Sequence, residues 1–96
     1  KQYIVTYGNH PAQMGGFQVV LRFPNNYGAS IILTPFSYGG QKGKLELAVI
    51  KWDSEKWQLD YDTPITSDVL GWLDPDEVRQ TLIQILGLPS TPVTVE

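Results

Sequence analysis

The chain has 96 residues, the size of one ordinary domain. Hydrophobic residues make up 42% of it and charged residues 18%, a composition typical of a folded protein and not of a disordered one. The lack of cysteine excludes disulfides, a thiolate nucleophile and a zinc–thiolate site, and the single histidine excludes His-rich metal sites. With no membrane-length apolar run and no signal-peptide pattern, we expect a soluble intracellular α+β domain.

The charges are unevenly distributed along the chain, although the net charge is only −3. Residues 1–52 hold five basic residues and one acidic residue, whereas residues 53–96 hold nine acidic residues and two basic ones. One interpretation is a bipolar surface whose acidic side meets a basic partner. The favoured alternative is that the two halves interleave in the sheet, so that the charges mix on the surface.

The opening of the chain predicts either an edge strand or an N-terminal extension. Tyr3–Tyr7 is a β-branched and aromatic run, and the glycine- and proline-containing stretch 8–11 interrupts it. We assign residues 1–16 to this segment, residues 17–88 to a single α+β domain and residues 89–96 to a flexible tail.

A hairpin is predicted over residues 17–33. Apolar residues alternate with other residues on both sides of Pro24–Asn26, whose residue types favour a turn. A three-residue loop places apolar residues opposite one another, whereas a two-residue loop mixes the faces. The first register is favoured, and it pairs Val19 with Ile31, Leu21 with Ala29 and Phe23 with Tyr27.

A second hairpin follows a loop at residues 34–43. Residues 44–52 are apolar on both faces, which predicts a central strand covered from two sides. Residues 57–61 return as its partner. The favourable cross-strand pairs are Asp53 with Lys56, Trp52 with Trp57, Ile50 with Leu59 and Ala48 with Tyr61.

The pattern then changes from strand to helix. Residues 62–66 contain a proline and predict a connector. Residues 67–73 predict a single helical turn, with Ser67 or Asp68 as its cap and Gly71 at its end.

A longer helix is predicted to begin after Asp74. Asp74 is the expected N-cap, Pro75 occupies the first helical position, and Glu77 can reach back to the Asp74 amide. Gly87 is expected to end the helix. The stripe that faces the sheet is predicted to consist of Val78, Leu82, Ile85 and Leu86. These elements predict an α+β fold: a small antiparallel sheet of four to five strands, built from hairpins and packed by one C-terminal helix.

No set of residues in the sequence predicts catalysis. Glycines beside lysines at residues 39–44 could form an anion nest, but the phosphate-loop motif fails because Tyr38 replaces its first glycine and Leu45 follows its lysine. Asp60 and Asp62 would share one face of a strand, where a solvated face is the favoured interpretation over a metal or acid–base pair. His10 has no catalytic companion at a telling spacing. We therefore expect a non-enzymatic protein without cofactor or metal.

Two binding surfaces are considered. Nucleic acid would be bound by a basic and aromatic strip, although an acidic chain has few positive charges for that role. Its basic residues would be Arg22, Lys42, Lys44 and Lys51. A protein partner would be bound by apolar residues with an acidic rim, against the alternative that single exposed apolar residues are normal. The residues of that surface would be Phe36, Tyr38, Trp72, Ile83, Asp76 and Glu77.

Residues 17–88 resemble a family of short, uncharacterised proteins carried by bacteriophages and prophages. The most specific element of the resemblance is the run Tyr61–Thr66, Tyr-Asp-Thr-Pro-Ile-Thr. It is supported by residues 27–32, 37–40, 45–49 and 68–73. The resemblance implies a phage-encoded accessory protein in the cytoplasm of a bacterial host, and it supplies no catalytic residues.

Together these observations predict a protein-binding or regulatory module, with a host factor or a second copy of the chain as its partner. Weak nucleic-acid binding through the Lys42–Lys44 loop is the alternative. No membrane association is expected.

Overall fold

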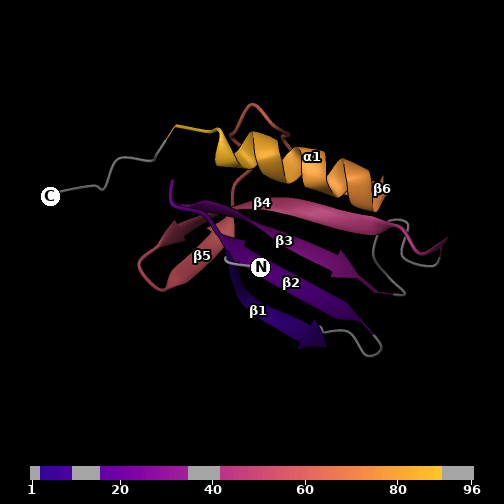
Figure 1. The fold of residues 1–96 in the computed structure, drawn as a ribbon. Coiled ribbons are helices and arrows are strands. Elements are labelled where there is room, and N and C mark those ends of the chain that lie inside the picture. Colours follow the sequence, from indigo (N-terminus) through magenta and orange to yellow (C-terminus); the bar gives the residue numbers. More distant parts are fainter. Residues whose placement is uncertain (1–2, 10–15, 35–41, 90–96) are drawn as a thin grey trace, which may run out of the picture.

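The structure is a computed structural model that describes residues 3–9, 16–34 and 42–89. One helix lies across a sheet of antiparallel strands, which confirms the predicted α+β architecture (Figure 1). Five strands follow one another in the order of the sequence and a sixth pairs with the fourth, so the sheet has more strands than predicted. The elements are β1 (Ile4–Asn9), β2 (Phe17–Arg22), β3 (Tyr27–Leu33), β4 (Leu45–Asp53), β5 (Lys56–Leu59), β6 (Leu70–Leu73) and α1 (Pro75–Leu86).

The opening segment forms an edge strand. β1 pairs antiparallel with β2, with a register shift between Ile4 and Thr6. The Arg22 backbone N–H donates to the Tyr3 carbonyl at 2.9 Å, and the Tyr3 ring meets the ring of Phe23 edge to face, with centroids 5.2 Å apart. This end of the chain is therefore joined to the core by both backbone and side-chain contacts.

The first hairpin has the predicted register. Val19 lies opposite Ile31 and Leu21 opposite Ala29, as the alternation of apolar residues required. The Phe23 N–H donates to the Tyr27 carbonyl at 2.8 Å and so closes the three-residue loop. Asn26 in this turn has φ 69°, a conformation that asparagine tolerates better than most residues.

The second hairpin is also confirmed, except at its far end. Trp52 lies opposite Trp57 and Ile50 opposite Leu59. β5 ends at Leu59, so the predicted pairing of Tyr61 is wrong. The cause is local, because the Asp60 carboxylate accepts the Asp62 N–H at 2.9 Å and thereby turns the chain out of the ladder.

The predicted helical turn at residues 67–73 is wrong, because the structure has strand β6 there. Leu70 and Leu73 pair with Leu47 and Leu45, along the part of the β4 edge that β5 leaves open. Asp68 forms a local turn instead of a helix cap, since its carboxylate accepts the Val69 N–H at 2.7 Å. The free β4 edge supplies backbone partners that an isolated turn lacks.

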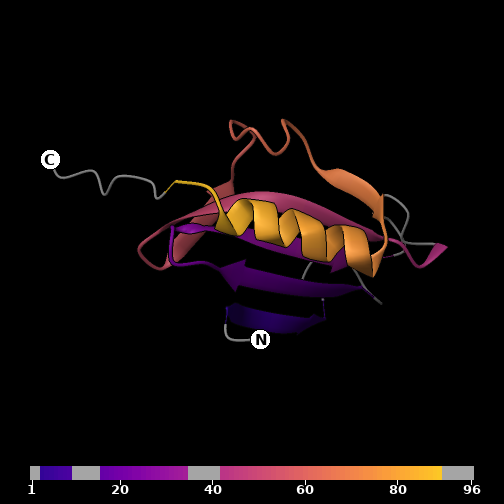
Figure 2. The same cartoon turned by 45° about the horizontal axis from the view of Figure 1, so that its top comes forward.

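The helix covers one face of the sheet, as Figure 2 shows. The main core lies between them and consists of Leu21, Phe23, Ala29, Leu47, Val49, Val78 and Ile85. A smaller buried cluster consists of Val20, Ile50 and Trp52. These residues alternate along β2 and β4 with those of the main core and therefore point to the other face of the sheet. β4 contributes to both clusters, as predicted for a strand that is buried on two faces.

Helix α1 begins as predicted and departs from the prediction near its end. Glu77 accepts the Asp74 N–H at 2.9 Å, and Val78 and Ile85 are buried. Leu86 is 39% exposed, so its assignment to the core stripe is wrong. At 100° per residue, Leu86 lies about 80° around the helix from Val78, whereas Ile85 lies only about 20° from it.

No helix in the described part of the chain is long and apolar enough to cross a membrane.

Candidate functional site

The predicted partner-binding residues that the structure describes lie on β6 and α1. Trp72 belongs to β6, Asp76 and Glu77 to the first turn of α1, and Ile83 to its later turns. Strand and helix follow each other almost directly, with Asp74 as the N-cap between them. Phe36 and Tyr38 lie outside the described residues, as do His10 and the predicted tail beyond Pro89.

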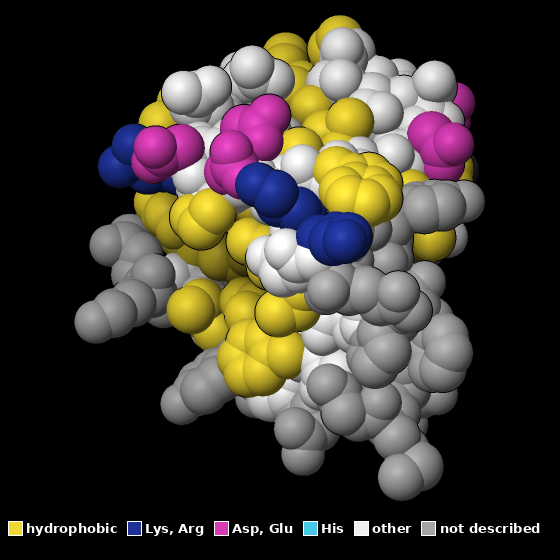
Figure 3. Space-filling model, turned by 90° about the vertical axis from the view of Figure 1, so that its right-hand side faces the viewer, with side chains coloured by type: hydrophobic (Ala, Val, Ile, Leu, Met, Phe, Trp, Pro, Cys, Tyr) yellow, Lys and Arg dark blue, Asp and Glu magenta, His cyan; other side chains and the backbone are white. Residues whose placement is uncertain are grey.

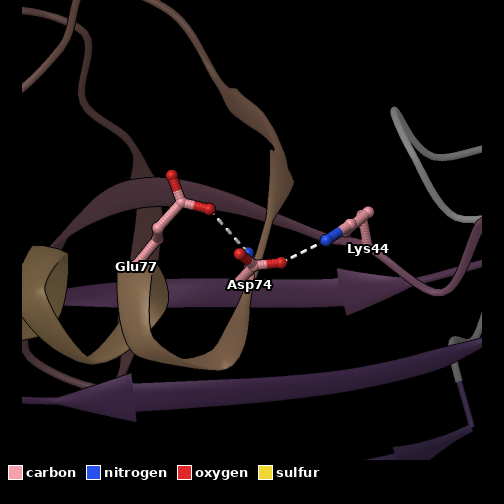
Figure 4. A network of polar contacts seen from close by, with 3 residues as sticks. All are labelled: Lys44, Asp74 and Glu77. Carbon is pink, nitrogen blue, oxygen red and sulfur yellow. Dashed lines mark hydrogen bonds and ion pairs between the residues drawn. The ribbon is translucent and has the colours of Figure 1, made fainter.

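The junction of β6 and α1 is fixed by polar contacts (Figure 4). The Lys44 ammonium pairs with the Asp74 carboxylate, which ties the start of β4 to the helix cap. Glu77 accepts the Asp74 N–H on the other side. The hydrogen bond and charge of Asp74 raise the pKa of Lys44. The helix N-terminus and the end of β6 are therefore held in one position relative to the sheet.

Trp72 has an unusual backbone conformation in β6. Gly71 and Trp72 lie opposite the single residue Glu46 of β4, which makes a β-bulge between the Leu70 and Leu73 pairs. Within this bulge, Trp72 has φ 59° and its side chain is exposed, at 58% for the whole residue. The bulge thus leaves a large aromatic residue at the surface next to a fixed junction.

The outward face of α1 carries Ile83, which is 62% exposed. Asp76 lies seven residues earlier and on the same face, about 10 Å away along the helix axis. The Asp76 carboxylate accepts a hydrogen bond from Arg79 at 3.0 Å. Figure 3 shows the side of the fold where β6 meets the start of α1. Apolar, basic and acidic side chains lie next to one another there.

A second exposed apolar surface was missed by the sequence analysis. Trp57 and Leu59 of β5 are 38% and 48% exposed, and Tyr61 follows them at 37%. The predicted pairing placed Trp57 and Leu59 beside Trp52 and Ile50, but it did not show that β5 would be an edge strand. Trp57 and Leu59 are on the last strand of the sheet, where a residue has a neighbouring strand on one side only, and Tyr61 lies beyond the end of that strand.

The four basic residues proposed for nucleic acid do not form one strip. The Arg22 guanidinium lies 5.0 Å from the centroid of the Trp52 ring and donates to the Ser54 carbonyl at 2.7 Å. Lys51 is on the opposite face of the sheet from Arg22, because their partners Tyr27 and Gly28 are adjacent in β3.

The remaining two basic residues lie near the start of β4. Lys42 is exposed, and Lys44 is paired with Asp74. Seven residues of extended chain separate Lys44 from Lys51, which is about 23 Å. The basic residues therefore occupy three separate places on the described surface.

The two carboxylates of Asp60 and Asp62 have a local structural role. They follow the end of β5 and form the turn described above, so they do not share a strand face as predicted. Within residues 3–9, 16–34 and 42–89, no three His, Cys, Asp or Glu side chains gather in a way that could hold a metal ion.

Comparisons with protein families, curated proteins and solved structures gave no match to this chain.

Proposed function

We propose that this protein is a non-enzymatic protein-binding module, of the accessory or regulatory kind implied by its resemblance to phage proteins. The observation that carries the proposal is the exposure of Trp72 and Ile83 on a strand and a helix that pack on the core. Apolar side chains on fixed elements bind with little loss of conformational entropy. Such residues form the centres of protein interfaces.

The proposed surface has an apolar centre and a charged rim. In this proposal Trp72 and Ile83 belong to the apolar centre. Asp76, on the same face of α1 as Ile83, and Glu77, about 120° around the helix from Ile83, are exposed in the first turn and belong to the rim. This arrangement matches the anatomy of protein interfaces, in which polar groups at the edge remain hydrated while the centre becomes dry. Phe36 and Tyr38 remain predicted members of the surface.

The biological setting is proposed from the sequence resemblance. A phage-encoded accessory protein would act in the cytoplasm of a bacterial host and would meet either a host factor or a second copy of itself. Nucleic-acid binding through Lys42 and Lys44 is less well supported, since Lys44 is engaged by Asp74 and the other basic residues lie elsewhere.

The test is capture from a bacterial lysate followed by measurement with purified components. The chain and its variants Ile83→Asp and Gln84→Asp are immobilised, and any captured protein is identified, purified and titrated by calorimetry. Both substitutions add one negative charge to an exposed position of α1, but Gln84 lies about 100° around the helix from Ile83. We expect Ile83→Asp to lower the affinity at least about tenfold and Gln84→Asp to leave it unchanged.

Two outcomes would contradict the proposal. A purified pair that does not associate would show that the capture was not specific. Equal affinity for both variants would show that the helix surface is not used. A labelled single-stranded oligonucleotide that binds at low salt and is released by high salt would favour the nucleic-acid alternative instead.

A further inference from the structure

Strand β5 ends the sheet with an open edge. It follows β4 in the strand order, and no described strand pairs with its other side. Trp57, Gln58 and Leu59 are all exposed. An open edge offers backbone N–H and C=O groups to a further strand. The strand that fits this edge has to match the residues that carry those groups.

The outward backbone groups of β5 belong to Trp57 and Leu59. In an antiparallel ladder, hydrogen-bonded pairs alternate with pairs whose N–H and C=O groups point away from each other. The Asp60 N–H donates to the Val49 carbonyl at 2.9 Å, so Asp60 and Val49 form a hydrogen-bonded pair. The next pair, Leu59 with Ile50, is therefore of the other kind, and the same holds for Trp57 two residues earlier. In the described structure, no hydrogen bond reaches the outward groups of Trp57 and Leu59.

We propose that this edge binds β5 of a second copy of the chain, so that the two sheets become one. A two-fold axis relates the two antiparallel strands, and one residue then lies opposite its own copy. With Gln58 at the axis, Trp57 lies opposite Leu59 of the second copy, and each such pair exchanges two backbone hydrogen bonds. Every outward group of β5 then has a partner. An axis at Trp57 or at Leu59 leaves the groups of the other residue without a partner inside the strand.

The same register matches the apolar side chains. Trp57 and Leu59 lie on the sheet face of Trp52 and Ile50, which are their cross-strand partners. Across the axis, Leu59 meets Trp57 of the second copy, so the apolar row that starts at Ile50 continues to Trp52 of that copy. Trp57 and Leu59 are 38% and 48% exposed in the single chain, and this pairing covers them.

On the other face, the register is complementary in charge. Lys56 lies opposite Asp60 of the second copy, and the two-fold axis repeats this pair. Both belong to non-hydrogen-bonded pairs, in which side chains are closest and opposite charges stabilise the ladder. Gln58 faces its own copy, and its amide group can both donate and accept a hydrogen bond there. Among the described residues, neither Lys56 nor Asp60 has an ion-pair partner in its own chain.

The other open edges are less suited to a second copy. β1 has a register shift between Ile4 and Thr6, and β6 has the bulge around Trp72. Such irregularities interrupt the regular spacing that a ladder needs, and they protect edge strands from pairing. β5 pairs with β4 without any shift. The proposed pairing involves different residues from the surface of Trp72 and Ile83, and it does not depend on the proposed function.

The register is tested by disulfide formation between copies, since the chain has no cysteine of its own. Gln58→Cys places a thiol opposite its own copy, at a Cα distance of about 4.5 Å that a disulfide can span. Glu55→Cys is the control, because it is also exposed but would lie about 20 Å from its own copy. We expect Gln58→Cys to cross-link at least about tenfold faster under a mild oxidant, because only its sulfurs can meet in the dimer. Equal rates overturn the inference.

Sedimentation equilibrium of the full chain measures the affinity, at concentrations up to about 1 mM because a short interface binds weakly. Lys56→Glu faces Asp60 of the second copy with a like charge in both pairs and should weaken dimerisation about tenfold. Lys42→Glu makes the same change of charge at an exposed position outside β5 and should alter the affinity by less than about threefold. An equimolar mixture of Lys56→Glu and Asp60→Lys should associate about as tightly as wild type, because the mixed dimer has opposite charges in both pairs.

Neutral variants keep the test decisive if a charge reversal disturbs the fold. Lys56→Gln and Asp60→Asn then replace the reversed residues, and each should weaken dimerisation about threefold. Asp60→Asn keeps an acceptor for the Asp62 N–H. A chain that stays monomeric up to about 1 mM overturns the inference and leaves the proposed function unaffected. A dimer that is lost on Ile83→Asp and kept on Lys56→Glu also overturns it, and it would assign self-association to the surface of Trp72 and Ile83.

Discussion

The side chain of Asn25, in the turn between β2 and β3, donates hydrogen bonds to backbone carbonyls at the C-terminal end of α1. Its amide nitrogen donates to the carbonyls of Ile85 at 2.8 Å and Leu88 at 3.0 Å, and its amide oxygen accepts the Tyr27 N–H at 3.0 Å. The last carbonyls of a helix lack partners within it. Gly87 ends α1 in the right-handed region, at φ −82°, so the left-handed cap expected of a glycine is not formed. Asn25 supplies donors to these carbonyls.

Removing the Asn25 amide is predicted to destabilise the fold. Asn25→Ala removes the side-chain donor of the Leu88 carbonyl and leaves the Ile85 carbonyl with the Leu88 N–H alone, and it should lower the free energy of unfolding by about 1–3 kcal/mol. Asn25→Asp should cost more, because it places a negative charge at the negative end of the helix dipole. Urea unfolding measures both. The control is the neighbouring Asn26→Gly, which suits φ 69° and should be nearly neutral; equal losses at positions 25 and 26 would contradict this role.

Gly28 is required by close packing between strands. A Cβ atom there would overlap the Leu21 carbonyl oxygen and would lie 2.9 Å from the carbonyl carbon and 3.0 Å from Trp52 Nε1. That indole N–H donates to the same Leu21 carbonyl at 3.1 Å. The absent side chain therefore makes room for a buried hydrogen bond that reaches across β3.

Gly28→Ala is predicted to be among the most destabilising small substitutions in the chain. We expect a loss of at least about 3 kcal/mol in the free energy of unfolding, because β2 and the Trp52 indole would have to move. Gly43→Ala is the matched control, since φ 74° opposes alanine there but no atom lies in its way. It should cost about 1–2 kcal/mol. Thermal melts that rank the two variants in the reverse order would contradict the packing argument.

At the scale of elements, α1 is stabilised chiefly by the face that it presents to the sheet. Ile85 is completely buried against β3 and β4 residues of the main core, whereas Ile83, two positions earlier, is 62% exposed. Both residues are isoleucines inside the same helix, so their replacement by alanine changes helix propensity equally. A difference in stability between the two variants therefore measures packing against the sheet.

Ile85→Ala is predicted to lower the free energy of unfolding by about 2–5 kcal/mol, because it opens a cavity between α1 and the sheet. Ile83→Ala should change it by no more than about 0.5 kcal/mol. Chemical denaturation of the two variants under one condition measures the difference. Similar losses at both positions would mean that the outer face of α1 is also packed, which would remove the surface proposed for binding.

At the scale of the whole molecule, the basic and acidic halves of the chain meet in the fold. Lys44 comes from the basic half and Asp74 from the acidic half, and their pair joins the start of β4 to the cap of α1. This contact supports the interpretation in which the charges mix on the surface and do not form two separate poles.

The pair predicts a loss of stability at alkaline pH. The pKa of Lys44 is raised by its hydrogen bond to Asp74, and the pKa of Tyr27 is raised by burial and then by Asp60. A group whose pKa is higher in the folded state contributes stability that is complete below its unfolded pKa and is lost as the pH rises through its folded pKa. The free energy of unfolding should therefore fall above about pH 10.

Urea titrations across this pH range test the assignment. Lys44→Met should be less stable than wild type near neutral pH and should show a smaller fall at alkaline pH, because it has no ammonium to lose. Tyr27→Phe should remove the remaining tyrosine contribution. An alkaline fall of the same size in wild type and Lys44→Met would show that the ion pair does not contribute.

Local patterns in the sequence determined the two hairpins and the start of the helix. Alternation fixed which residue of β2 faces which residue of β3, because a shift by one position would have turned apolar side chains to the wrong face. The turn residues at 24–26 and 53–56, and the Asp74–Glu77 cap, act over a few residues and can be recognised without the rest of the fold.

The tertiary structure decided what depends on distant neighbours. Residues 67–73 became a strand because an open stretch of the β4 edge was available to them, and no local pattern shows where a sheet edge will be free. The same holds for the candidate surface: the sequence offered Trp72 and Ile83 as exposed candidates, but the bulge that strains Trp72 arises only from pairing with β4. Local chemistry thus set the two hairpins, their registers and the start of α1, whereas contacts between segments far apart in the chain set strand β6 and which side chains remain exposed.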